Sequence, residues 1–240
     1  MLTDSSKTKW LPPKIYKPVN IIVGGYGSGK SEVAVNLARF LVNDPSFDIR
    51  PISILDLDIV NPYFRSREAA LELEKLGIKP INPVGSQFYA DLPIILPQIR
   101  GAIQSTEGTI ICDVGGDEVG ARVLSSLATS FTRETYDMML VLNINRPFTS
   151  NVEGTIKLIA EIESSSRLKF SSVISNTHLM DDTTVDSVLD GIKIAREVCQ
   201  QAQLNFAFVS AEEKILAEID SSKIDLPVLT LNRSLLKPWE

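Results

Sequence analysis

Short apolar runs alternate along this chain with longer stretches in which apolar residues recur every three or four positions. The short runs lack the polar–apolar alternation of half-exposed strands, and they are typical of strands covered on both faces. The longer stretches have the period of helices that bury one face. The expected strands are residues 20–24, 51–56, 109–113, 138–143, 171–176 and 205–209. The expected helices are residues 30–42, 65–76, 96–104, 119–132, 151–163, 185–201 and 211–219.

This alternation of strands and helices predicts the fold class and the domain organisation. We expect an α/β protein with a doubly wound, mostly parallel β-sheet and helices on both faces. Residues 1–18 are polar and then proline-rich, and we expect them to form an irregular N-terminal arm. Residues 19–240 contain no internal repeat and no break in composition, so we expect them to form a single domain.

The segment after the first expected strand has the pattern G-x-x-x-x-G-K-[ST] of a phosphate-binding loop, or P-loop. Glycines allow backbone N–H groups to curl around an anion, and the N-terminus of the following helix adds partial positive charge. Lys30 would reach the β- and γ-phosphates, and the Ser31 hydroxyl group would bind Mg²⁺. The motif therefore predicts a P-loop domain that binds a nucleoside triphosphate. The expected nucleotide-binding residues of this segment are Gly25, Tyr26, Gly27, Ser28, Gly29, Lys30, Ser31 and Glu32.

An acidic residue ends the expected strand 109–113, at the edge of a parallel sheet where ligands bind. The sequence continues Asp113-Val114-Gly115-Gly116. Asp113 would hold the hydration shell of Mg²⁺ near Ser31, and the two glycines would form a turn whose N–H groups sense a γ-phosphate. The alternative is that Asp113 only caps the next helix.

Asp56 and Asp58 end the second expected strand, and side chains two positions apart on a strand share a face. One carboxylate would orient the attacking water or complete the Mg²⁺ shell, unless the pair is simply a solvated strand end. Arg65, Arg67 and Arg146 follow strand ends, and each is either a phosphate-stabilising residue or an ordinary surface arginine. The expected catalytic residues are Lys30, Asp56, Asp58 and Asp113, and the expected Mg²⁺ ligands are Ser31, Asp58 and Asp113.

Together, the P-loop, the D-x-D pair and the D-x-G-G segment resemble the MinD/ParA/CobQ group of P-loop ATPases. That group belongs to a wider class that also contains signal-recognition GTPases and dethiobiotin synthetases. The resemblance covers roughly residues 20–209. It implies that Asp56 and Asp58 lie in switch I near the nucleotide and that Asp113 is the Mg²⁺-side acid of switch II. It also implies that Asn176 contacts the nucleotide base.

One position departs from the pattern of this group. Many members carry a second lysine near the start of the P-loop, which reaches the phosphates of a partner subunit across a dimer. Gly25 occupies that position here, so the sequence does not support a dimer that uses this lysine. A different dimer, or catalysis by an arginine of the same chain, stays open.

The resemblance implies a Mg²⁺-dependent ATPase that acts as a nucleotide-driven conformational switch on a partner protein, in maturation or positioning. ATP and Mg²⁺ are the implied cofactors, and the partner is another protein or a second copy. The alternative is an ATP-dependent small-molecule kinase or ligase of the dethiobiotin-synthetase type, with Asp58, Arg65 and residues 88–91 around a second substrate. A third possibility is a binding module that does not hydrolyse nucleotide. We favour ATP over GTP because Asn176 is followed by Thr177-His178-Leu179 rather than completing an N-K-x-D motif.

Composition and charge bear on the partners and the location of the protein. The net charge of −6 argues against bulk binding to nucleic acid. No apolar run approaches the roughly 20 residues that span a bilayer, and the first residues lack the apolar core of a secretory signal. The two cysteines, Cys112 and Cys199, are not spaced for a metal site. We therefore expect a cytoplasmic protein.

Overall fold

The computed structural model describes residues 10–58, 67–81, 92–105 and 107–233. These residues build an eight-stranded sheet in which the paired strands are parallel. The strands are β1 (Val19–Gly24), β2 (Ile52–Asp56), β3 (Lys79–Ile81), β4 (Thr109–Gly115), β5 (Tyr136–Leu142), β6 (Ser172–Ser175), β7 (Asn205–Glu212) and β8 (Val228–Leu231). The expected fold class, a doubly wound α/β sheet, is confirmed.

The strand order is β3-β2-β4-β1-β5-β6-β7-β8, which places β1 in the interior of the sheet. The strands up to β4 lie on one side of β1, and the strands from β5 onward lie on the other side. Ile22 of β1 pairs in register with Asp113 of β4 and with Met139 of β5. The segment that follows β1 therefore leaves the sheet where the order reverses, which is the usual ligand site of such folds.

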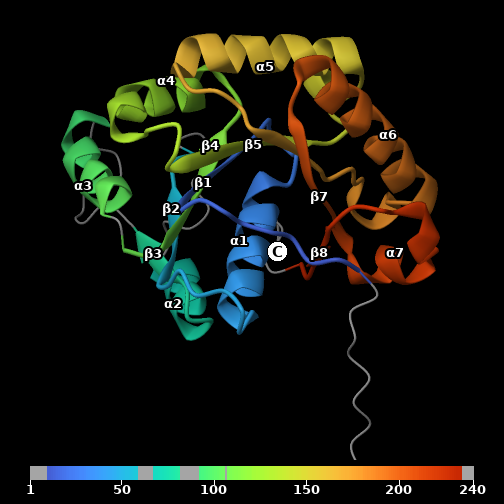
Figure 1. Ribbon diagram of the computed structural model, residues 1–240, viewed down its shortest axis with the longest axis horizontal. Helices are drawn as coiled ribbons and strands as arrows, with labels where there is room; N and C mark the ends of the chain where they lie inside the picture. The colour runs from blue at the N-terminus through green and yellow to red at the C-terminus, as the bar shows by residue number, and fades with distance from the viewer. Residues whose placement is uncertain (1–9, 59–66, 82–91, 106, 234–240) are drawn as a thin grey trace, which may run out of the picture.

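Helices cover both faces of the sheet (Figure 1). Helix α1 packs against β1, β2, β4 and β8, whereas α4 and α5 lie side by side on the opposite face, with α6 next to α5. The helices are α1 (Lys30–Asn43), α2 (Arg67–Lys75), α3 (Leu92–Gln104), α4 (Glu118–Leu127), α5 (Val152–Ser166), α6 (Val185–Ala202) and α7 (Glu213–Glu218).

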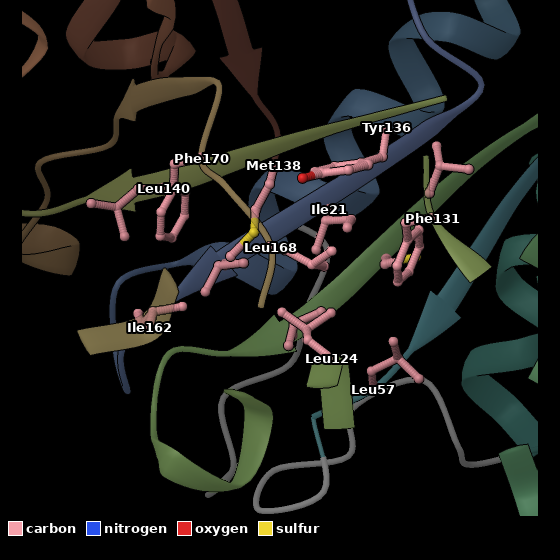
Figure 2. Close-up of a cluster of buried hydrophobic side chains, with 14 of the residues drawn as sticks. Ile21, Leu57, Leu124, Phe131, Tyr136, Met138, Leu140, Ile162, Leu168 and Phe170 are labelled. Carbon is pink, nitrogen blue, oxygen red and sulfur yellow. The ribbon is translucent and has the colours of Figure 1, made fainter. Parts of the chain in front are cut away.

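Successive residues of the central strands supply the two faces with separate hydrophobic cores, because side chains alternate along a strand. Ile21 packs in one core with Leu124 of α4 and Ile162 of α5 (Figure 2). Ile22 packs in the other core with Leu37 of α1. The unbroken apolar runs of the sequence follow from this double burial.

Each expected strand and helix has a counterpart, although residues 65 and 66, where α2 was expected to start, lie outside the described residues. The sequence missed β3 and β8, which are three and four residues long. Helix α3 begins at Leu92 rather than at residue 96, and it runs through Pro97. Helix α7 is shorter than expected because β7 continues to Glu212.

Residues 10–18 contain no helix or strand, yet they contact the sheet and its cores. The carbonyl oxygen of Leu11 accepts a hydrogen bond of 2.8 Å from the Val228 N–H group. Trp10 packs against a third hydrophobic cluster, which contains residues of α6, β7 and α7. Ile15 packs against the core that contains α1. Among the described helices, none is both long enough and apolar enough to cross a lipid bilayer.

Candidate nucleotide-binding site

The P-loop leaves β1 at Gly24 and enters α1 at Lys30. Gly27 and Gly29 have φ angles of 71° and 84°, a region in which a Cβ atom is strained. Gly29 occupies the N-cap position of α1, and its carbonyl accepts the N–H group of Val33 at 2.9 Å. The loop thus has the turn that the glycine pattern predicts.

Loops after β5 and β6 pack against the outside of this P-loop. A Cβ atom added to Gly27 would lie 2.8 Å from Cζ of Arg146, and one added to Gly29 would lie 2.4 Å from Nδ2 of Asn176. The glycines are therefore needed for close packing as well as for their φ angles. This contact joins segments that are more than a hundred residues apart.

Lys30 forms a buried ion pair with Asp58, with 2.7 Å between Nζ and Oδ2. The Asp58 N–H group donates to Oδ1 of Asp56 at 3.0 Å. The Leu57 side chain, between the two acids in the sequence, packs in the hydrophobic core that also contains Leu124 of α4 (Figure 2). Both carboxylates are only 2% exposed, so the D-x-D pair is not a solvated strand end.

The Ser31 hydroxyl group donates a hydrogen bond of 2.5 Å to Oδ2 of Asp113. Asp113 is fully buried, and Asp56 pairs with it in register on the neighbouring strand. Burial raises the pKa of the Asp113 carboxyl to about 7, and the nearby Asp56 and Asp58 act in the same direction. The Lys30 charge and the Ser31 hydrogen bond oppose this rise in pKa.

The second oxygen of Asp113, Oδ1, is buried and has no hydrogen-bond partner among the described residues. A buried carboxylate oxygen costs free energy unless a proton, donor or cation satisfies it. A hydroxyl group and a carboxylate are also hard oxygen ligands of the kind that Mg²⁺ prefers. Ser31 and Asp113 would therefore hold a magnesium ion, whereas Asp58, the third expected ligand, is paired with Lys30.

The D-x-G-G segment lies directly on the P-loop. Strand β4 continues through Gly115, so the expectation that both glycines form a turn is wrong, and the turn begins at Gly116. The Gly116 N–H group donates to the carbonyl oxygen of Gly24 at 2.9 Å. A Cβ atom at Gly116 would lie 2.7 Å from backbone atoms of Gly24 and Gly25. Helix α4 is capped by Asp117, whose Oδ1 accepts the Gly120 N–H group at 2.8 Å. The alternative for Asp113, that it only caps the next helix, is therefore wrong.

Asn176, the expected base-contacting residue, is 1% exposed and bonded at both ends of its amide. Its Nδ2 donates to the Ser28 carbonyl at 2.8 Å, and its Oδ1 accepts the Ser210 hydroxyl at 2.9 Å. The amide thus fastens the P-loop to the ends of β6 and β7. Its contact with a nucleotide base stays a prediction.

Asn143, which the sequence did not mark as a site residue, holds together the loops after β5 and β6. Its Nδ2 donates to the His178 carbonyl at 3.1 Å, and its Oδ1 accepts the Asn145 N–H group at 3.0 Å. Helix α5 is capped by Asn151, whose Oδ1 accepts the Gly154 N–H group at 2.8 Å. The His178 ring lies beside Gly29, and burial, followed by the charge of Arg146, lowers its pKa.

The remaining expected residues lie in different settings. Tyr26, in the P-loop, is 81% exposed, and Glu32 accepts a hydrogen bond of 2.9 Å from Nδ2 of Asn36 within α1. Arg67 begins α2. Arg65 and the segment 82–91, including residues 88–91, lie outside the described residues.

Comparison with known proteins gives a match at the level of structure only. No protein-family model and no curated protein matches the sequence. The cell division protein FtsY of Thermotoga maritima is similar, with a TM-score of 0.51 and 18% identity over 91% of this chain and 70% of that chain. The chloroplast FtsY of Physcomitrella patens has a TM-score of 0.51 and 16% identity over 90% of this chain and 66% of that one. The signal recognition particle receptor FtsY of Elizabethkingia anophelis, in complex with GDP, has a TM-score of 0.50 and 15% identity over 89% and 63%.

These similarities concern the fold. The chain shares the α/β fold of these FtsY structures. The similarity does not single out the MinD/ParA/CobQ group. The chain spans about two-thirds of the length of these structures.

Proposed function

We propose that this chain is a Mg²⁺-dependent P-loop ATPase that works as a nucleotide-driven conformational switch. The observation that carries the proposal is the hydrogen bond of 2.5 Å between Ser31 and Asp113, beside the ion pair of Lys30. It places the two oxygen groups suited to Mg²⁺ next to the lysine suited to the β- and γ-phosphates. These groups come from segments far apart in the sequence: the start of α1 for Lys30 and Ser31, and β4 for Asp113.

The residues have separable tasks in this proposal. Bound Mg²⁺ would neutralise the charge that develops on the transferred phosphoryl group. Asp113 must lose its proton to serve as a ligand, and Lys30 must exchange its contact with Asp58 for one with phosphate. Asp56 or the released Asp58 would then orient the attacking water.

The switch part of the proposal rests on the contact between the D-x-G-G turn and the P-loop. A γ-phosphate in the loop would compete with Gly24 for the Gly116 N–H group, since that group lies at the loop itself. Movement of the turn would carry Asp117 and the start of α4 with it. A partner protein or a second copy that contacts α4 would detect this change.

The choice of nucleotide and of family group also belongs to the proposal. The sequence after Asn176 lacks the lysine and the acid of N-K-x-D, which supports ATP. A structural neighbour was determined in complex with GDP, so GTP is the alternative to measure. We retain the MinD/ParA/CobQ assignment on its sequence motifs. The cytoplasmic location stays a prediction.

Two measurements test the proposal. With Mg²⁺ and without a second substrate, the purified chain should hydrolyse ATP faster than GTP. The Asp113→Asn variant should lose this Mg²⁺-dependent hydrolysis. Turnover that requires an added small molecule would favour the kinase or ligase alternative. Hydrogen exchange of the Gly116 amide should differ between the ADP state and a non-hydrolysable ATP analogue state. Equal exchange in both states would argue against a switch at this turn.

A further inference from the structure

Among the residues that the structure describes, Lys30 and Arg146 are cations at the P-loop, and they differ in their partners. Lys30 is paired with Asp58 at 2.7 Å. Arg146 is half-buried, and its Nε donates to the Gly27 carbonyl oxygen at 2.7 Å. Within the part of the chain that the structure describes, no aspartate or glutamate forms an ion pair with Arg146. No acidic side chain of these described residues therefore neutralises its positive charge.

The buried side chains of the site carry more negative than positive charge. Asp56, Asp58 and Asp113 are all buried at the ends of β2 and β4, and Lys30 is the buried cation among them. A nucleotide adds further negative charge, and buried negative charge is costly unless it is compensated. Mg²⁺ would supply part of the compensation. The site still favours another positive charge close to the loop.

Arg146 has the chemistry and the rigid support for this task. A guanidinium group carries a planar fork of N–H donors, so terminal N–H groups remain after Nε is used. The backbone around it is fixed, because the Arg146 N–H group donates to the Asn143 carbonyl at 3.0 Å. The Arg146 carbonyl accepts the Thr149 N–H group at 3.1 Å. The side chain is thus held against the loop by a buried scaffold.

We propose that Arg146 supplies, from within the same chain, the positive charge that the P-loop uses to hold the phosphates of a nucleotide. It is a positioning residue, which fixes the loop through the Gly27 carbonyl and places its charge against the loop. This role makes a lysine from a second copy unnecessary, in keeping with Gly25 at that position. The inference rests on the proposed nucleotide-binding function.

The test separates the charge of Arg146 from its hydrogen bond. Affinities for ATP, ADP and AMP, each with Mg²⁺, are measured by calorimetric titration for the wild type, Arg146→Lys and Arg146→Gln. Arg133→Gln is the matched control, because Arg133 also donates to a backbone carbonyl, that of Lys169 at 3.1 Å, but at the start of β5. Circular dichroism and thermal unfolding check that each variant folds.

The role of charge predicts an order of effects. Arg146→Gln should weaken ATP binding about tenfold, the size of one charge-assisted contact, and should weaken AMP binding less. Arg146→Lys should recover most of the loss, whereas Arg133→Gln should bind like the wild type. The proposal is overturned if Arg146→Gln binds ATP like the wild type, or if all three nucleotides lose affinity equally and lysine restores none of it. Failure of the wild type to bind any nucleotide would instead overturn the proposed function itself.

Discussion

At the carboxyl edge of the sheet, the ends of β2 and β4 present buried carboxylates, whereas the ends of β5, β6 and β7 present buried amides and a hydroxyl group. We call the first set the acidic half (Asp56, Asp58 and Asp113) and the second set the amide half (Asn143, Asn176 and Ser210). The acidic half has one buried lysine and an unpartnered carboxylate oxygen. The amide half is tied together by hydrogen bonds to the P-loop and to neighbouring loops.

This difference separates chemistry from support. Burial, together with the nearby Asp56 and Asp58, raises the pKa of Asp113. Buried carboxylates placed this close together cost stability, so their arrangement has a reason when a cation and phosphates enter between them. Amides that satisfy backbone carbonyls gain stability in the protein alone. We therefore expect changes in the acidic half to affect binding and turnover most, and changes in the amide half to affect mainly the order of the P-loop.

The largest effect is expected from Lys30→Ala. Loss of the phosphate contact should weaken ATP binding by roughly 3 kcal/mol, or about 100-fold. The variant should also lose stability, because Asp58 is left buried without its cation. Adding Asp58→Asn should restore the free energy of unfolding but not the binding. Calorimetric titration and urea unfolding check both parts, and a double variant that regains binding would contradict the assignment of Lys30.

Asp113→Asn should abolish Mg²⁺-dependent turnover, with a loss of about 100-fold or more, because the metal loses its charged ligand. Nucleotide binding without Mg²⁺ should change little. Steady-state hydrolysis at several Mg²⁺ concentrations provides the measurement. Unchanged turnover would remove Asp113 from the site.

The same residue predicts a pH dependence of stability in the absence of Mg²⁺ and nucleotide. The pKa of Asp113 is raised from 3.8 to about 7 in the folded state, so the folded protein binds this proton more tightly. Its contribution is fully present below 3.8 and is lost as pH rises through 7. At pH 8, Asp113→Asn should be more stable than the wild type by roughly 2 to 4 kcal/mol, a difference that narrows toward pH 5. Urea unfolding at both pH values tests this, and a difference that widens at low pH would refute it.

Gly116→Ala tests the contact between the turn and the P-loop. The new Cβ atom would lie 2.7 Å from the backbone of Gly24, so turn and loop must separate. We expect turnover to fall about tenfold, a barrier increase of roughly 1.4 kcal/mol. Gly101→Ala is the control, because a Cβ atom there meets no atom within 4 Å. That change, within α3, should leave turnover unaltered and add about 0.5 to 1 kcal/mol of stability.

The smallest effect on turnover is expected in the amide half, where changes act on stability. Asn176→Ala removes the donor to the Ser28 carbonyl and leaves the Ser210 hydroxyl only the longer contact of 3.5 Å with the Ser175 carbonyl, at a cost in stability of about 1 to 3 kcal/mol. Ser210→Ala should cost less, because Asn176 keeps its bond to Ser28. Thermal unfolding compares the two variants. An Asn176→Ala variant as stable as the wild type would contradict the supporting role of the amide half.

The sequence predicted the acidic half better than the amide half, for a physical reason. The P-loop and the strand-end acids are local patterns, so each residue carries its own signal in the sequence. The roles of Asn143 and Ser210 depend instead on β5, β6 and β7 being neighbours, and sequence periodicity does not give strand order. The contact of Arg146 with Gly27 likewise depends on β5 lying next to β1, so the sequence did not predict it. Strand β3 was missed because it has three residues and one of them is Pro80, which is disfavoured in strands. Strand β8 was missed although β6, which is equally short, was expected.

The most direct test of the central claim is a calorimetric titration of the wild type and Lys30→Ala with ATP and with GTP, each with and without Mg²⁺. We predict that the wild type binds a nucleoside triphosphate, more tightly with Mg²⁺ and more tightly for ATP, and that Lys30→Ala binds it about 100-fold more weakly. Absence of binding by the wild type to both nucleotides, or equal binding by Lys30→Ala, would contradict the assignment of this edge of the sheet as a nucleotide site.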